Sequence, residues 1–389
     1  MLLLVTTSCD GQEETSPLPI NTVSITLSTG NTVEVPAQQV ISAGSNHTLV
    51  VKGDGTVWAF GNNEHGQLGN GTTEASLEPV QVEGLRDVVK VSAGRRFSAA
   101  LDAHGQLWMW GLNEDGQLGN STRETKLRPV GVLEEVSEVA TGNSATLALR
   151  DDGTLLGWGL NLDGNFGLSD RVGRFLLTPT PIQERPDVRA IGRPKVGVVV
   201  VQADGDVWAW GDSVLTEGEI DIGDREFPNP KRIKHLSSIC SISTGTDYAL
   251  ALTCSGEVWA WGDNWIGQLG VDETTDPRFK PTRMQALEGR TIVAVAAYYK
   301  HSLALDSDGQ VWGWGNNDYR PIPVTDLTIT YLPAQFPTLG NIVAIAAGVD
   351  STIALDKDGK VWAVGYSGVG DKLEDEEIVY SEPHLVMTR

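Results

Sequence analysis

The chain has 389 residues and carries 51 Asp and Glu residues against 29 Lys and Arg residues, for a formal net charge of −22 at pH 7. Such an acidic chain repels phosphate backbones, so we expect no nucleic acid among its partners. The sequence contains no run of 18 or more apolar residues, and it therefore predicts no membrane-spanning helix. Its three Cys and six His residues do not cluster at ligand spacing, so we expect no metal site.

Residues 1–17 resemble the end of a bacterial lipoprotein signal followed by a polar tether. An apolar run at 2–5 precedes Thr-Thr-Ser and Cys9, the residue that such a signal would lipidate. The run is short and no Lys or Arg precedes it, which a start codon assigned too far downstream would explain. The alternative is an undistinguished N-terminal tail. We expect export, lipid anchoring to a bacterial membrane or cell surface through Cys9, and no other membrane contact. Residues 18–35 form an N-terminal extension with a candidate β-hairpin.

Residues 36–389 contain seven copies of one unit, which repeats every 48 to 53 residues. The opening strands start at Ile41, Val91, Val139, Ile191, Ile242, Val295 and Ile345. Each copy continues with a second apolar run, a tight turn such as Asp54-Gly55, a Trp-containing strand, a Gly-rich loop and a last short strand. Asp-Gly between apolar runs is a strong hairpin signal. We therefore predict an all-β fold, a seven-bladed β-propeller of four-stranded antiparallel blades. We expect the strand near 385–387 to pair beside that near 40–43 and close the ring.

Eleven of the twelve Trp residues occupy two positions of the third strand, spaced two residues apart and so on one face. The first position holds Trp58, Trp108, Leu156, Trp208, Trp259, Trp312 and Trp362. The second holds Phe60, Trp110, Trp158, Trp210, Trp261, Trp314 and Val364. We expect these rings to fill the wedges between blades. The alternative, stacking on sugars or bases, needs rings exposed in an open groove.

The first copy carries Ser-Ala-Gly at 42–44, Asp-Gly at 54–55, Phe-Gly at 60–61 and Gly-Gln-Leu-Gly at 66–69, and the second matches it closely. This combination resembles the repeat of the regulator of chromosome condensation over about residues 39–389. The resemblance implies a seven-bladed propeller. Its best-known eukaryotic member is a nucleotide-exchange factor for the small GTPase Ran, and a bacterial member is a secreted β-lactamase inhibitor. We interpret the Gly-Gln-Leu-Gly tetrapeptide as structural. Copies three, four, six and seven depart from the pattern, and their loops have either acquired another role or drifted.

Cys240 and Cys254 lie on the two strands that open the fifth copy, nearly opposite each other. In an oxidising compartment they can form a disulfide. The alternative, two free thiols in the core, is the one that we expect.

No catalytic motif is present, neither a nucleophile elbow nor a phosphate-binding loop nor a spaced His-Glu metal motif. His47 and His301 share a repeat position that holds Phe97, Ala145, Gly197, Tyr248 and Ser351 in the other copies, and this variety indicates packing. We therefore expect no catalytic residues, no cofactor and no enzymatic activity.

Alternation of the hairpins predicts one face of the ring that gathers the turns after the opening strands and the Gly-rich loops. Variable loops on a rigid scaffold often bind partners, and Tyr, Trp and Arg are enriched at binding hot spots. We expect this face to bind a protein through Arg95, Arg96, Phe97, Tyr248, Trp265, Tyr298, Tyr299, Lys300, Tyr319 and Arg320.

The function that we expect is a monomeric, non-enzymatic interaction scaffold. One alternative is a protein inhibitor of a secreted hydrolase. A less favoured one is a nucleotide-exchange factor, for which the sequence shows no GTPase-contacting wedge.

Overall fold

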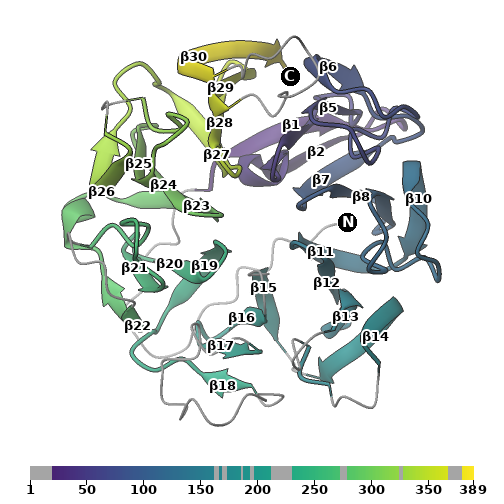
Figure 1. Ribbon diagram of the computed structural model, residues 1–389, viewed down its shortest axis with the longest axis horizontal. Coiled ribbons are helices and arrows are strands. Elements are labelled where there is room, and N and C mark those ends of the chain that lie inside the picture. Colours follow the sequence, from purple (N-terminus) through teal and green to yellow (C-terminus); the bar gives the residue numbers. More distant parts are fainter. Residues whose placement is uncertain are drawn as a thin grey trace.

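The computed structural model describes residues 20–161, 166–168, 173–184, 187–192, 197–211, 230–271, 278–323, 327–366 and 379–389. These residues form a ring of seven four-stranded antiparallel sheets (Figure 1). A two-stranded hairpin of β1 (Thr22–Thr26) and β2 (Thr32–Pro36) precedes the ring. Within the described ranges the helices are two short 3-10 turns, η1 (Ala37–Gln39) and η3 (Gln285–Leu287). The predicted fold class is therefore confirmed.

The blades follow one another in chain order, each running from the centre of the ring to its rim (Figure 1). Blade 1 comprises β3 (Ile41–Ala43), β4 (His47–Val51), β5 (Val57–Gly61) and β6 (Ser76–Gln81). Blade 2 comprises β7 (Val88–Ala93), β8 (Phe97–Asp102), β9 (Leu107–Gly111) and β10 (Lys126–Leu133). Blades 3 and 4 comprise β11 (Val136–Thr141), β12 (Ala145–Arg150), β13 (Thr154–Leu160), β14 (Phe175–Glu184), then β15 (Val188–Gly192), β16 (Val198–Gln202), β17 (Val207–Trp210), β18 (Lys231–Arg232).

Blades 5 and 6 comprise β19 (Ile239–Thr244), β20 (Tyr248–Thr253), β21 (Val258–Gly262), β22 (Arg278–Arg283), then β23 (Ile292–Tyr298), β24 (His301–Asp306), β25 (Val311–Asn316), β26 (Ile329–Gln335). Blade 7 comprises β27 (Ile342–Ala347), β28 (Ser351–Asp356), β29 (Lys360–Tyr366) and β30 (Val379–Thr388).

Tight turns fix the register of the strands inside each blade. Between β4 and β5, Gly55 adopts a φ of 74° and Thr56 donates its backbone N–H to Asp54 Oδ1 at 3.0 Å. Val51 therefore pairs with Val57, and Val50 with Trp58. Such turns lie on one face of the ring, the Asp-Gly face. The turns after each first strand and the long loops after each third strand lie on the other, the loop face.

The Trp residues at the second position of the third strand lie between blades. Trp110, Trp158, Trp210, Trp261 and Trp314 are all essentially unexposed. The core clusters around them combine residues of neighbouring blades. At the first position most rings are only partly buried, and Trp108 and Trp362 donate to the turn carboxylates of Asp102 and Asp356. The predicted inter-blade role is confirmed for the second position, and none of these five rings lies in an open groove.

In copies one, two and five a Gly-Gln-Leu-Gly loop follows the third strand, and in the first copy it contacts the next blade. Leu68 is fully buried, and the carbonyl of Gln67 accepts hydrogen bonds from Trp110 Nε1 and Ser98 Oγ of blade 2, both at 2.8 Å. Gly69 has a φ of 69°, and a Cβ there would lie 2.7 Å from Trp110 Nε1. The tetrapeptide is therefore structural, as the sequence indicated.

The ring does not close in the predicted way. The last strand, β30, pairs with β29 of its own blade, Leu385 lying opposite Trp362, and not with the strand near 40–43. Blades 7 and 1 instead share one apolar core cluster, and the N-terminal segment adds hydrogen bonds to blade 7. Asn21 Nδ2 donates to Val343 O at 3.2 Å, and Ile345 N donates to Gln38 Oε1 at 3.2 Å.

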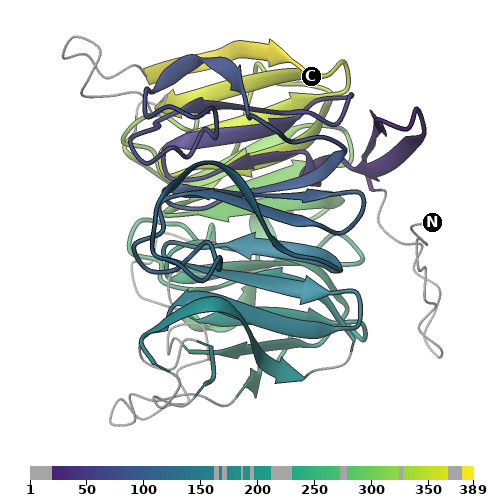
Figure 2. The same ribbon diagram turned by 90° about the vertical axis from the view of Figure 1, so that its right-hand side faces the viewer.

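The hairpin of β1 and β2 packs beside this closure. The backbone of Thr26 donates to Gly53 O at 2.7 Å, and Ser28 Oγ donates to Asp87 at 2.5 Å. Gly53 and Asp87 belong to the Asp-Gly face, and Figure 2 shows the purple hairpin projecting from that side of the ring. The N-terminal segment thereby connects blade 7 with blades 1 and 2.

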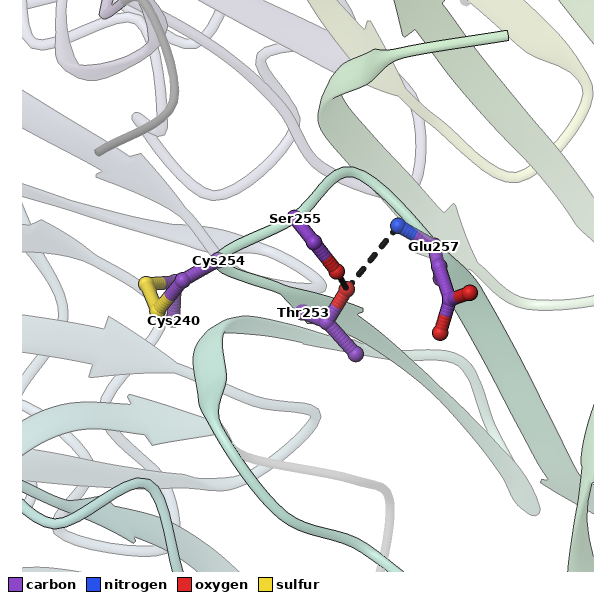
Figure 3. Close-up of a disulfide and its surroundings, with 5 residues drawn as sticks. All are labelled: Cys240, Thr253, Cys254, Ser255 and Glu257. Carbon is purple, nitrogen blue, oxygen red and sulfur yellow. Dashed lines mark hydrogen bonds between the residues drawn. A yellow bond between two sulfur atoms is a disulfide. The ribbon is translucent and has the colours of Figure 1, made fainter. Parts of the chain in front are cut away.

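Cys240 and Cys254 form a disulfide (Figure 3), with Cα atoms 5.1 Å apart. The expectation of two free thiols is therefore wrong. The physical reason is the irregular register between β19 and β20: Ile239 pairs with Thr253 and Ser241 with Leu252, which places Cys240 at the irregularity beside Cys254. Cys254 also donates its backbone N–H to Ser238 O at 2.9 Å. Both Cys residues are partly exposed on the Asp-Gly face and lie outside the core.

Candidate binding face

The turns after the first strands converge on a hollow of about 420 Å³ at the centre of the loop face. Its walls come from six blades, because residues of blades 1, 2, 3, 5, 6 and 7 line it. They are Ser45, Asn46, Asn62, Glu64, Gln67, Arg95, Arg96, Gly142, Asn143, Thr244, Gly245, Thr246, Tyr298, Tyr299 and Val349. Four of the ten predicted binding residues, Arg95, Arg96, Tyr298 and Tyr299, therefore meet at one site.

Tyr298 ends β23 and Tyr299 follows it in the turn, and both line the hollow. The Tyr298 hydroxyl reaches Ser45 Oγ of blade 1 at 3.3 Å, although Tyr298 belongs to blade 6. Burial raises the pKa of Tyr298, against smaller lowering effects of the Ser45 hydrogen bond and the Arg95 charge. Tyr299 has a φ of 45° and remains 39% exposed, so its ring is available to a partner.

Arg95 and Arg96 supply positive charge to the same hollow. Both side chains are exposed, and the backbone of Arg95 donates to Gly142 O of blade 3 at 3.2 Å. Thr246 of blade 5 likewise donates its backbone N–H to Tyr299 O of blade 6 at 3.2 Å. Hydrogen bonds between neighbouring turns thus fix the positions of the turns that carry the charged and aromatic groups.

Phe97 and Tyr248 do not contribute to this surface, and the prediction is wrong for both. Each side chain is fully buried, and Tyr248 donates its hydroxyl to His301 O of the next blade at 2.7 Å. They begin the second strand of their blades, a position whose side chain packs toward the next blade. His47 shows the same arrangement, with Nε2 2.9 Å from Ser98 Oγ. The sequence contained the signal, since Phe97 and Tyr248 share the repeat position of His47 and His301.

The other predicted binding residues lie outside the lining of the hollow. Trp265 is 58% exposed on the blade 5 loop, and Lys300 lies with its Nζ 5.4 Å from the ring centroid of Tyr299. Tyr319 packs against Tyr366 with ring centroids 5.5 Å apart, and Arg320 is exposed beside it. The structure therefore does not gather these four residues with Arg95, Arg96, Tyr298 and Tyr299. Cys9, the predicted lipidation site, lies outside the described residues.

Sequence reasoning missed the polar turn residues Ser45, Asn46, Asn143 and Thr246, which line the hollow. They follow the Gly that recurs in the first turn of several copies, so alignment of the copies on that Gly would have gathered them. Polar residues at a turn are a weaker indication of a binding site than aromatic residues, because polar side chains there also satisfy backbone groups.

The described part of the chain contains no cluster of three or more His, Cys, Asp or Glu residues that could hold a metal ion. It also contains no helix long and apolar enough to cross a membrane. Burial lowers the pKa of His47 to about 3 and that of His301 to about 4, so both imidazoles are neutral near pH 7.

Solved structures share this ring. Prp20p from Saccharomyces cerevisiae, studied together with its binding to Gsp1p and histones, superposes with a TM-score of 0.75 at 21% identity, over 90% of this chain and 88% of that one. Human WBSCR16 gives a TM-score of 0.71 at 24% identity, over 84% and 89% of the two chains. At these identities the likeness shows the fold alone.

Curated relatives match shorter segments. The ultraviolet-B receptor UVR8 of Arabidopsis thaliana is 36% identical over 133 residues, which is 34% of this chain and 30% of that protein. The human E3 ubiquitin-protein ligase HERC2 is also 36% identical over 133 residues, but these cover 33% of this chain and 3% of the ligase. The match thus spans less than a third of the length of either relative.

Two family models of the regulator of chromosome condensation (RCC1) repeat match the chain. One matches residues 54–101, 104–149, 255–305 and 308–355. The other matches residues 39–67, 88–117, 136–165, 239–264, 292–320 and 342–371. Together the matches cover more than half of the chain, which therefore belongs to the family of regulator of chromosome condensation repeat proteins.

Proposed function

We propose that this chain is a non-enzymatic interaction scaffold that binds a protein through the central hollow of its loop face. The observation that carries the proposal is the convergence of two exposed Arg side chains and two Tyr side chains on that hollow. Tyr and Arg are residue types that dominate binding energy in protein interfaces. Arg95 and Arg96 outnumber the one carboxylate in the lining, Glu64, so the hollow contrasts with the acidic remainder of the chain.

The geometry suits a protein partner. A standard interface buries about 800 Å² on each partner, and turns of six blades line the hollow, so a partner that covers it contacts most of the ring. Because neighbouring turns are hydrogen-bonded to each other, binding requires little ordering of the rim, and less affinity is lost to conformational entropy. A partner with a carboxylate near its centre would pair with Arg95 and Arg96.

The relatives do not specify the partner. Prp20p was studied with Gsp1p and histones, UVR8 is a receptor and HERC2 is a ubiquitin ligase. If the chain were a protein inhibitor, its partner would be a hydrolase, and if it were an exchange factor, its partner would be a GTPase. Identification of the bound protein decides among these alternatives.

We also propose that the chain is exported and lipid-anchored through Cys9. The disulfide between Cys240 and Cys254 supports an oxidising compartment, because such bonds are rare in reducing cytosol. Metabolic labelling with a palmitate analogue should mark the full chain and not a Cys9→Ser variant. An unlabelled native chain would refute lipid anchoring.

The test of the binding face is affinity capture with the full chain as bait, followed by quantitative binding of the protein identified. An Arg95→Glu, Arg96→Glu, Tyr299→Ala variant should lose at least about tenfold in affinity, since three exposed contact groups are removed or reversed. Arg86→Glu is the matched control, because Arg86 is an exposed Arg near the Asp-Gly face. Unchanged affinity of the triple variant, with native circular dichroism, would refute the proposed face.

A further inference from the structure

Blade 6 departs from its neighbours at the turn that follows its first strand. Five other copies begin this turn with a Gly, namely Gly44, Gly94, Gly142, Gly245 and Gly348. A Cβ on Gly245 would lie 1.9 Å from the ring of Tyr248, so that turn has no room for a side chain. The sixth copy has Tyr298 at the same position, and β23 continues through it, whereas β19 ends before Gly245. The sixth copy thus adds a phenol to the central hollow.

The phenol of Tyr298 belongs to a group of three hydrogen-bond donors in the lining of the hollow. Its hydroxyl lies 3.3 Å from Ser45 Oγ, and either oxygen can be the donor. One such bond uses one of the two hydroxyl protons, so the other proton is available to a ligand. Burial raises the pKa of Tyr298, and the charge of Arg95 is near enough to counteract part of that rise. Blades 6, 1 and 2 therefore each contribute one donor, Tyr298, Ser45 and Arg95.

The charge of the hollow favours a single carboxylate as the ligand. Within the described residues, neither Arg95 nor Arg96 forms a salt bridge. A planar guanidinium group can bind both oxygens of a carboxylate at once. Glu64 also lines the hollow, and the chain has a net charge of −22. These negative charges oppose a doubly charged phosphate more strongly than a single carboxylate.

Two amide side chains in the lining indicate that the ligand is part of a polypeptide. Asn46 belongs to blade 1 and Asn143 to blade 3, the two blades on either side of blade 2, which carries Arg95 (Figure 1). Neither amide group forms a hydrogen bond with another side chain or backbone group in the part of the chain that the structure describes. A side-chain amide can donate to a backbone carbonyl and accept from a backbone N–H. Polypeptide can therefore be bound on both sides of the carboxylate, which suits a residue inside a chain better than a chain end.

We propose that the partner presents the side-chain carboxylate of an Asp or Glu residue, at the tip of a protruding loop, to Arg95, Tyr298 and Ser45. The loop continues on one side toward Asn46 and on the other toward Asn143. A cavity of about 150 Å³ holds a benzene-sized group, and the hollow of about 420 Å³ therefore has room for the tip of a loop. This inference rests on the proposed function for the partner being a protein, and it adds the group and the shape by which that partner is recognised.

The probe is a cyclic hexapeptide of Gly and Ser residues with one Glu, and its control is the same ring with Gln in place of Glu. We titrate each to millimolar concentration into the full chain with isotopically labelled Arg side chains. The Glu ring should shift the Nε signals of Arg95 and Arg96 but not that of Arg86, which is exposed near the Asp-Gly face. The Gln ring should bind about tenfold or more weakly, because hydrogen bonds to a charged group are stronger than those to a neutral one.

Two further probes distinguish the sources of a negative charge. One is a linear peptide of Gly and Ser whose single carboxylate is its C-terminus, and the other is inorganic phosphate. Both should bind more weakly than the Glu ring, because neither presents a carboxylate with polypeptide on both sides. Tighter binding of the linear peptide would assign the hollow to a chain terminus, and tighter binding of phosphate would assign it to a phosphorylated ligand. Either result would overturn the inference.

Variants locate the carboxylate within the hollow. A Tyr298→Phe, Ser45→Ala double variant removes both hydroxyl groups and keeps both Arg residues, and it should bind the Glu ring about tenfold more weakly. Tyr331→Phe is the matched control, because it removes a hydroxyl from the outer strand β26 of the same blade and should bind like the native chain. Arg95→Gln changes an exposed residue and should also weaken binding, which keeps the test decisive if the double variant misfolds.

The outcomes separate this inference from the proposed function. No shift at Arg95 in the native chain, equal binding of the two rings, or unchanged binding by the folded double variant would overturn the inference. The proposed function is judged on the captured protein and the Arg95→Glu, Arg96→Glu, Tyr299→Ala variant. If that variant loses the captured protein while the Glu ring does not bind the native chain, the binding face is retained and the carboxylate inference is wrong.

Discussion

Replacement of Trp110 by Ala tests how the blades are held together. Trp110 is fully buried between blades 1 and 2 and donates its Nε1 proton to Gln67 O at 2.8 Å. Truncation of a buried Trp costs about 3–5 kcal/mol of unfolding free energy, and the lost hydrogen bond contributes about 1 kcal/mol of this. Trp108, two residues earlier on β9, faces the same way but remains partly exposed and binds the turn carboxylate of Asp102. Its truncation should cost only about 1–2 kcal/mol.

Urea unfolding of the two variants, followed by far-ultraviolet circular dichroism, measures this difference. Both should keep the native slope of free energy against urea, and Trp110→Ala should have the lower midpoint. If Trp108→Ala were as destabilising as Trp110→Ala, the inter-blade position would not be the main source of stability, and our account of the Trp pattern would be refuted.

Three further predictions concern other parts of the ring. Gly69→Ala should destabilise the protein by more than about 1 kcal/mol in the same urea assay, because the φ of Gly69 is positive and the new Cβ meets Trp110. Gly84→Ala should cost less, because no atom lies within 4 Å of the new Cβ there. Equal losses of stability in the two variants would contradict the packing argument. Reduction of the disulfide between Cys240 and Cys254 should lower the free energy of unfolding by about 3 kcal/mol, because the bond closes a short loop. A thermal unfolding midpoint that reductant leaves unchanged would contradict this prediction. Burial holds the pKa of His301 at about 4 in the native chain. Below about pH 6.5 the unfolded chain therefore binds a proton that the native chain does not. The free energy of unfolding should fall between pH 7 and pH 4 as a result. His301→Tyr, which introduces the residue type that Tyr248 supplies at the same repeat position, should reduce that fall, and an unchanged pH profile would count against it.

The repeat pattern was sufficient to predict the ring because the same physical problem recurs in every copy. Each Asp-Gly turn sets a hairpin, and each Trp strand needs a neighbouring blade to bury its ring. The register that places Trp110 inward could therefore be derived before any coordinates. The same reasoning identified the Gly-rich loop as structural, and Leu68 is indeed buried.

The details of ring closure could not be predicted from the repeat, because the hydrogen bonds that accompany the packing of blade 7 on blade 1 come from residues outside it. Asn21 and Gln38 lie before the first copy, and their contacts with blade 7 span more than 300 positions of sequence. Such contacts have no local signature. The disulfide escaped prediction for a related reason, since the strand irregularity that aligns Cys240 with Cys254 is a feature of register.

The candidate site was predicted in part. The face and the convergence of Arg95, Arg96, Tyr298 and Tyr299 followed from hairpin alternation. The prediction failed for Phe97 and Tyr248 because it relied on their being aromatic. An aromatic ring at the first residue of an inner strand is stabilised more by packing on the next blade than by facing solvent. Repeat position was the better guide than residue type.

Site-specific photo-crosslinking tests the central claim most directly. A photoreactive phenylalanine analogue placed at Tyr299 of the full chain lies at the central hollow, and one placed at Arg86 lies near the Asp-Gly face as a matched control. We predict a covalent adduct with the captured partner from position 299 and none from position 86. An adduct from position 86 alone would contradict the assignment of the loop face as the binding surface.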